Sequence, residues 1–172
     1  MVDFNQFTKE QFDQVIKFGK RSNVLFGSEV PMLIYFPYRF VKIDLPELLS
    51  SGNIEELIKL ICEQQKIQIK EAKPKEVISF ILWLKDEIEA IQQLESIHLN
   101  STPDPDMIAA GVHELNELGE INVIDSLAGG DILKWAEIEK LPYHRIFDKL
   151  KKNTVESKVN KEYQKIVTRK RK

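Results

Sequence analysis

The stretch "PKEVISFILWLKDEIEAIQQLESIHL" (residues 74–99) decides the fold class. Its apolar residues recur at helical spacing, and charged residues fill many of the positions between them. The apolar positions are Val77, Phe80, Ile81, Leu84, Ile88, Ile91 and Leu94. This pattern predicts a single amphipathic helix of about six or seven turns that buries one face. It therefore favours a mainly α-helical protein, a helical bundle built around this element.

Shorter helices are predicted on both sides of the long one, because residues typical of helix starts and stops recur there. Asn53 can cap one of them, and Glu56 completes the capping box. Helices are expected at 8–19, at 44–52, from 53 onward, at 104–119 and at 131–140.

A minor β element is predicted before the long helix. The stretch "VPMLIYFPYRFVKID" (30–44) is rich in β-branched and aromatic residues, and Pro37 interrupts it. This composition favours two short extended segments, or an edge strand with a bend, over residues 30–43. The alternating "KIQIK" (66–70) predicts a strand that could pair with it, and "EINVID" (120–125) predicts a short extended piece.

The C-terminal third predicts a corner followed by a helical arm. Asp125 is expected to cap a single turn that Gly129 and Gly130 end, and Asp131 to cap the next helix. Leu141–Pro142 forces a bend, because the residue before a proline avoids helical geometry. A break at Asn153–Thr154 is expected before the last stretch.

The length of 172 residues and the hydrophobic content of 42% fit one core with appendages. We predict a mainly helical body over residues 1–152 and a basic amphipathic arm over residues 153–172. Cys62 is the only cysteine, so no internal disulfide framework is possible and a reducing compartment is expected. No signal-peptide pattern and no run of membrane-spanning length is present, which favours synthesis in a cytoplasm and no membrane partner.

The charge distribution is strongly asymmetric, although the formal net charge is only -2. Residues 149–172 carry ten basic and two acidic side chains, a formal charge of +8. The preceding 148 residues carry 15 basic and 25 acidic side chains, a formal charge of -10. An acidic body with a basic tail predicts that the tail binds an acidic surface. That surface could be nucleic acid, another protein or the body of a neighbouring copy.

Four short motifs suggest site chemistry, and each lacks a necessary part. "HELNE" (113–117) has no second histidine for a zinc-peptidase site, and Cys62 has no accompanying base. "AGGD" (128–131) places a carboxylate where an anion would bind, and "TPDPD" (102–106) lacks the downstream ligands of a calcium loop. We therefore predict no catalytic residues, no metal and no cofactor, and a non-enzymatic protein.

Three interpretations of the basic tail stay open: a solvated end, a nucleic-acid-binding arm and a protein-docking helix. Docking is favoured because only it explains the apolar residues that recur among the charges, at Val155, Val159, Tyr163, Ile166 and Val167. The predicted apolar contacts are Phe147, Leu150, Tyr163, Ile166 and Val167. The predicted electrostatic contacts are Lys158, Lys161, Lys165 and Arg169.

Three segments together resemble virion-assembly proteins of tailed bacteriophages, particularly the crAss-like phages of gut Bacteroidetes. They are "VPMLIYFPYRFVKIDLPELL" (30–49), "D…LAGGDILKW" (125–135) and "LPY…IFDKL" (141–150). The resemblance covers most of residues 30–165, and its motifs are not catalytic. It implies a ring protein beneath the portal that joins capsid to tail.

The resemblance and the charge pattern together predict a structural head–tail connector or tail ring subunit that forms a homo-oligomer. Its expected partners are its own copies and the portal or neighbouring tail proteins, and its expected location is the virion, after assembly in the host cytoplasm. Two alternatives stay open. One is a tail assembly chaperone that is absent from the virion, and the other is a nucleic-acid-binding regulator that uses the basic tail.

Overall fold

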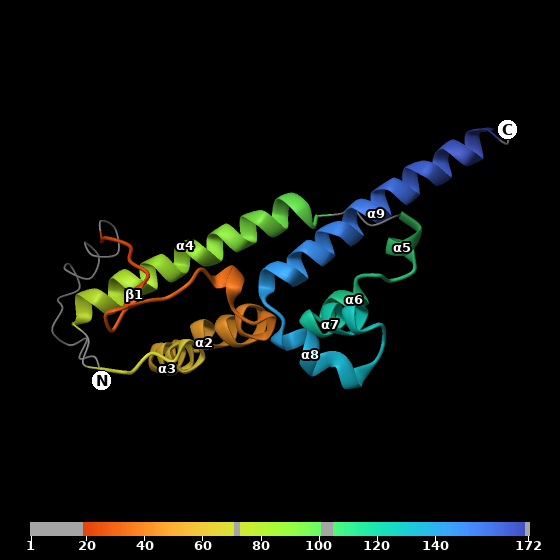
Figure 1. Cartoon of the computed structure of the whole chain (residues 1–172). Coiled ribbons are helices and arrows are strands. Elements are labelled where there is room, and N and C mark those ends of the chain that lie inside the picture. The colour runs from red at the N-terminus through yellow and green to blue at the C-terminus, as the bar shows by residue number, and fades with distance from the viewer. Residues whose placement is uncertain (1–18, 71–72, 101–104, 171–172) are drawn as a thin grey trace. The chain divides into compact units, whose positions relative to one another are not determined.

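The computed structural model describes residues 19–70, 73–100 and 105–170 (Figure 1). Within these ranges the chain is mainly α-helical and has a minor β element, which confirms the predicted fold class. The helix predicted at 8–19 lies almost entirely outside the described residues, as does most of "TPDPD" (102–106).

The chain divides into two compact units. Unit 1 comprises the residues up to Phe36 and Phe40–Ile91. Unit 2 comprises Pro37–Arg39 and the residues from Gln92 onward. The division falls within the long helix α4 (Pro74–His98), so that each unit includes part of it.

In unit 1, α2 (Leu45–Ser50) and α3 (Ile54–Gln65) precede α4. The backbone N–H of Glu56 donates a hydrogen bond to the side chain of Asn53, which confirms the predicted cap of α3. The core of this unit is apolar and takes side chains from β1 (Val24–Leu25), from the turns at 33–35 and 40–44, and from α2, α3 and α4. Its most deeply buried members are Leu25, Leu33, Phe36, Phe40, Leu45, Leu57, Ile61, Val77, Phe80 and Leu84.

The β element lies before the segment in which it was predicted. Strands β1 (Val24–Leu25) and β2 (Ser28–Glu29) form an antiparallel hairpin, the one sheet among the described residues. Its two-residue turn, Phe26–Gly27, has φ of 53° and 76°, and positive φ at both positions matches the right-handed twist of a tight hairpin.

The predicted strands at 30–43 and 66–70 are wrong. Leu33–Tyr35 is a 3-10 turn and Phe40–Asp44 is a π-helical turn, while residues 67–70 have no regular structure. Prolines at 31 and 37 remove two ladder donors from the first segment, so it could not serve as an ordinary strand. Several of the apolar residues that suggested a strand, among them Leu33, Phe36 and Phe40, instead enter the core of unit 1.

Unit 2 consists of short helices followed by one long helix. In chain order these are α5 (Pro105–Ala109), α6 (Glu114–Glu117), α7 (Glu120–Ala128), the 3-10 helix η4 (Ile132–Lys134), α8 (Trp135–Lys140) and α9 (Tyr143–Lys170). As predicted, α7 ends at Gly129, and the Asp131 side chain accepts a hydrogen bond from the backbone N–H of Leu133. Leu141 is extended, as expected before Pro142.

Three predictions for the part of unit 2 before α9 are wrong. The single helix expected at 104–119 is broken into α5 and α6. Between them Gly111 has φ of 83°, a backbone conformation that residues other than glycine rarely adopt. The piece expected to be extended at 120–125 is helical, because Ile124 and Ala128 are four residues apart and are buried together. Asp125 lies inside this helix and accepts a hydrogen bond from the Trp135 indole.

Two stacked tyrosines connect the segments of unit 2. Tyr38 and Tyr143 are almost fully buried, with ring centroids 6.3 Å apart and nearly parallel planes. The Tyr38 hydroxyl donates a hydrogen bond to Glu120, and the Tyr143 hydroxyl donates to Glu95 at 2.8 Å. The Tyr38 N–H also donates to the carbonyl of Leu141. Pro37–Arg39 thereby becomes part of unit 2, although it is distant in sequence.

We expect the stability of the fold to fall at alkaline pH because of the buried pair Tyr38 and Tyr143. Burial, followed by hydrogen bonding to a carboxylate, raises the pKa of Tyr38 and of Tyr143 well above its usual value. Such a phenol stays protonated in the folded chain and ionises in the unfolded chain near pH 10, so its stabilising contribution is complete below about pH 10 and is lost as the pH rises further.

Urea unfolding across this range measures the effect. The double variant Tyr38→Phe/Tyr143→Phe should lose that part of the pH dependence and, at neutral pH, about 1 kcal/mol for each hydrogen bond removed. The exposed Tyr35→Phe is the control and should behave like the parent protein. An unchanged alkaline profile in the double variant would contradict the assignment.

Candidate docking surface on helix α9

Helix α9 is continuous over 28 residues, and the break predicted at Asn153–Thr154 does not occur (Figure 1). The Thr154 hydroxyl donates a hydrogen bond to the carbonyl of Leu150 at 3.0 Å, so this polar side chain is satisfied within the helix. The boundary between a body at 1–152 and an arm at 153–172 is therefore not marked by a change in secondary structure. It stays a prediction, and we use "arm" below for Asn153–Lys170.

The first turns of α9 pack against the rest of unit 2 through one face. Tyr143 and Ile146 are buried, and Phe147 and Leu150 are half-buried on the same side of the helix. An α-helix turns about 100° per residue, which allows this face to be followed along the arm. The positions that continue it are occupied by polar side chains: Thr154, Ser157, Lys161, Gln164 and Thr168.

The apolar residues of the arm occupy a different face. Val155, Val159, Tyr163 and Ile166 have exposed fractions of 52%, 61%, 60% and 50%. At about 100° per residue these four lie within an arc of about 80°, centred about 160° from the buried face of the first turns. We call these four residues the apolar stripe. It is too regular for scattered surface residues, and it faces away from the side on which α9 packs.

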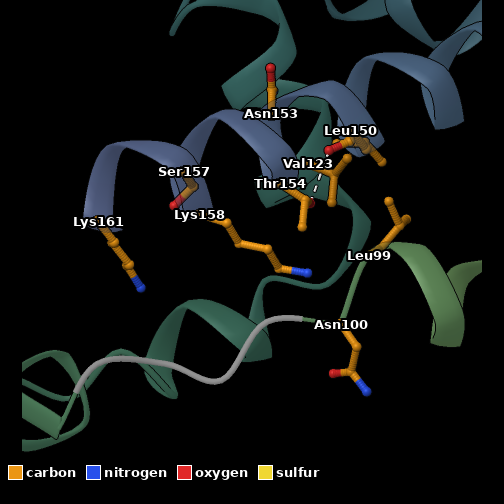
Figure 2. Close-up of a pocket in the computed structure, with 9 residues that line it drawn as sticks. All are labelled: Leu99, Asn100, Val123, Leu150, Asn153, Thr154, Ser157, Lys158 and Lys161. Carbon is orange, nitrogen blue, oxygen red and sulfur yellow. Dashed lines mark hydrogen bonds between the residues drawn. The ribbon is translucent and has the colours of Figure 1, made fainter. Parts of the chain in front are cut away.

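A groove lies along the polar side of the arm (Figure 2). It has a volume of about 700 Å³. Its apolar lining comes from Leu99, Val123 and Leu150, and the rest of its lining is polar. In Figure 2 Lys158 and Lys161 extend from α9 toward the side on which Asn100 lies, whereas Asn153 points the other way. The described lining carries ammonium, hydroxyl and amide groups and no carboxylate, imidazole or thiol, so it suits an acidic partner better than acid–base chemistry.

The charges on the arm are partly paired. Lys152 lies 2.5 Å from Glu156, and Lys165 lies 2.6 Å from Glu162. Hydrogen bonding to these lysines lowers the pKa of both exposed glutamates. Among the described residues, no carboxylate lies within salt-bridge distance of Lys158 or Lys161. The arm therefore keeps a basic edge for a partner.

The predicted contact residues fall into two groups. Phe147 packs against Tyr143 and His98, with ring centroids 6.2 Å and 6.0 Å away, and Leu150 lines the groove. Both are part of the packing of unit 2 at the base of the arm. The other predicted contacts lie on the arm itself: Lys158, Lys161, Tyr163, Lys165, Ile166, Val167 and Arg169. Of these, Val167 is half-buried at the margin of the apolar stripe.

Sequence reasoning missed a second exposed apolar surface, because it assigned residues 107–118 to the apolar stripe of one continuous helix and residues 120–125 to an extended piece. On α5–α7 the exposed fractions of Met107, Ile108, Leu115, Leu118 and Ile121 are between 47% and 53%. The available signal was charge, since residues 105–128 contain five carboxylates and no lysine or arginine. An amphipathic segment without basic residues is well suited to a basic partner.

The motifs that suggested chemistry belong to different elements, with Cys62 in unit 1 and His113 and Asp131 in unit 2. Cys62 is buried in α3, and burial raises the pKa of its thiol. His113 precedes α6 at the surface, and Asp131 caps η4. Across the described residues no group of three or more His, Cys, Asp or Glu side chains could hold a metal ion. Of the described helices, none combines the length and the apolar content that crossing a membrane requires.

Comparison with known proteins adds no assignment. No family model, no curated protein and no solved structure matches this chain. The interpretation of the docking surface therefore depends on its own geometry and charge.

We expect the apolar stripe to contribute little to the stability of the isolated chain. Ile166→Ala should change the free energy of unfolding by less than about 0.5 kcal/mol, because the side chain is half exposed and alanine favours the helix. Ile146→Ala removes the same atoms from a buried site on the same helix and should cost about 2–5 kcal/mol.

Urea unfolding of the two variants at low protein concentration makes this comparison. A similar loss in both variants would mean that Ile166 is covered within its own chain.

Proposed function

We propose that the protein is a structural, non-enzymatic subunit of a tailed bacteriophage particle, a head–tail connector or tail ring subunit that works as a homo-oligomer. The observation that carries the proposal is the apolar stripe of α9, which is half or more exposed at every position and faces away from its own unit. Regular apolar exposure on one helix face is typical of a surface that another protein covers.

The charges of the chain support binding between identical copies. The arm is basic, and residues 105–128 are acidic and carry exposed apolar side chains of their own. A subunit that carries two complementary surfaces can bind the next copy with one and the previous copy with the other. Connector rings are built in this way, and adhesion is the only activity that this mechanism requires.

The phage assignment is supported by the resemblance of residues 30–49, 125–135 and 141–150 to virion-assembly proteins of crAss-like phages. Several residues of these segments pack in the core or shape turns of unit 2. Tyr38 and Tyr143 form the buried stack, and Asp131 and Pro142 mark the turns on either side of α8. A scaffold that positions an exposed arm fits a ring protein better than an enzyme.

Mass spectrometry of purified particles of the phage that encodes this chain tests the proposal. We expect the protein in every preparation, in a fixed ratio to the portal protein, together with a ring at the portal vertex in electron micrographs. Its absence from particles, combined with abundance in infected cells, would overturn the proposal in favour of a tail assembly chaperone.

A salt titration of DNA binding tests the regulator alternative. An arm that neutralises several phosphates loses affinity steeply as salt rises. We expect only weak binding without preference for sequence. Tight sequence-specific binding at physiological salt would count against the structural role.

A further inference from the structure

The surface formed by α5 and α6 lacks the burial that a folded segment needs. No residue between Pro105 and Leu118 is buried, although Met107, Ile108, Leu115 and Leu118 are apolar. The two helices have five and four residues, far below the length at which a helix is stable by itself in water. Fixing this backbone costs conformational entropy, and the segment buries none of its large apolar side chains to offset that cost. The segment therefore needs a partner that covers its apolar side chains.

The charge of this surface indicates the chemistry of that partner. Glu114 and Glu117 are exposed beside Leu115 and Leu118, and the whole stretch 105–128 has no lysine or arginine. A partner that covers the leucines must bring apolar side chains, and one that faces the glutamates is favoured if it is basic.

The arm of α9 has these two properties. Its apolar stripe supplies Val155, Val159, Tyr163 and Ile166. Lys158, Lys165 and Arg169 follow beside it and form a basic edge, in which Lys165 already pairs with Glu162 of its own helix. The stripe is exposed in its own copy, so the arm does not already cover α5 and α6 of the same chain. Both surfaces belong to unit 2, so each copy has one of each.

We propose that the arm of one copy docks on the α5–α6 surface of the next copy, with the apolar stripe on Leu115 and Leu118 and the basic edge on Glu114 and Glu117. This inference depends on the proposed function only in taking self-assembly as its starting point. The contact is head-to-tail, because the two surfaces are different parts of one chain. Such contacts produce a ring when the rotation between copies closes, and a filament when it does not.

The length of the arm suggests a weak single contact. From Val155 to Lys170 it is about 24 Å long, which suits one helix laid across two short ones. An interface of this kind is at the low end of the size of stable interfaces. In a closed ring every copy makes two contacts, so the release of one copy requires both of its contacts to break.

Complementation between two variants tests this contact in the full-length protein. The arm variant carries Val159→Asp and Ile166→Asp, and the surface variant carries Leu115→Asp and Leu118→Asp. All four side chains are about half or more exposed, so we expect both variants to keep the helical circular dichroism of the parent. Each variant alone should be monomeric by native mass spectrometry, whereas the parent protein should form higher oligomers.

Mixing the two variants should yield a one-to-one heterodimer that grows no further. The surface variant retains a working arm and the arm variant retains a working surface, so one contact forms and the others are blocked. A mixture that stays monomeric would overturn the inference. So would a parent protein that stays monomeric, or an arm variant that assembles like the parent.

A charge exchange provides a second test that leaves the apolar residues in place. Lys158→Glu/Lys165→Glu and Glu114→Lys/Glu117→Lys should each weaken assembly at least tenfold, and a chain that carries all four changes should regain most of it. Glu137→Lys, on the exposed side of α8, is the control and should assemble normally. Failure of the four-fold variant to recover would overturn the electrostatic part of the contact.

The two proposals can fail separately. Presence in virions is decided by particle composition, and the contact is decided by complementation in solution. A protein found in particles whose variants assemble normally would retain the proposed function and lose this interface.

Discussion

Helix α9 can bury only one face against its own unit, and its apolar side chains do not stay on that face. Up to Leu150 they lie on the packed side, and from Val155 they lie nearly opposite. The polar residues that replace them on the packed side line an open groove. This change of face means that the helix continues without a break while its apolar side chains leave the packed side of unit 2 and become exposed.

Unit 2 carries a second exposed apolar surface, whose charge is opposite to that of the arm. Short helices α5 and α6 expose apolar side chains among carboxylates, and residues 105–128 contain no basic residue. Apolar burial would supply most of the attraction between the two surfaces, and charge would select the partner and the orientation. A docking mechanism of this kind needs no catalytic group.

The elements that could be predicted from sequence are those whose signals are local. The long helix, the Asn53 cap, the end of α7 and the corner at Pro142 each follow from spacing or backbone chemistry within a few residues. Some errors depend on local geometry, at Gly111 and at Asn153–Thr154, and the others occurred where burial by distant residues decides. Residues 30–43 resemble a strand in composition, but their ladder pairing within the described chain is limited to an isolated bridge between Pro37 and Pro142. Residues 120–125 are held in a helix by the burial of Ile124.

The sequence by itself determined a mainly helical chain with an acidic body, a basic apolar arm and no catalytic motif, because composition and periodicity state these properties directly. Only the tertiary structure decided that Phe147 and Leu150 belong to the packing of unit 2, and that the stripe from Val155 to Ile166 remains exposed. It also showed that most apolar side chains of residues 105–118 are exposed. Periodicity records which residues share a face of a helix, but whether that face is covered depends on which segments fold back against it.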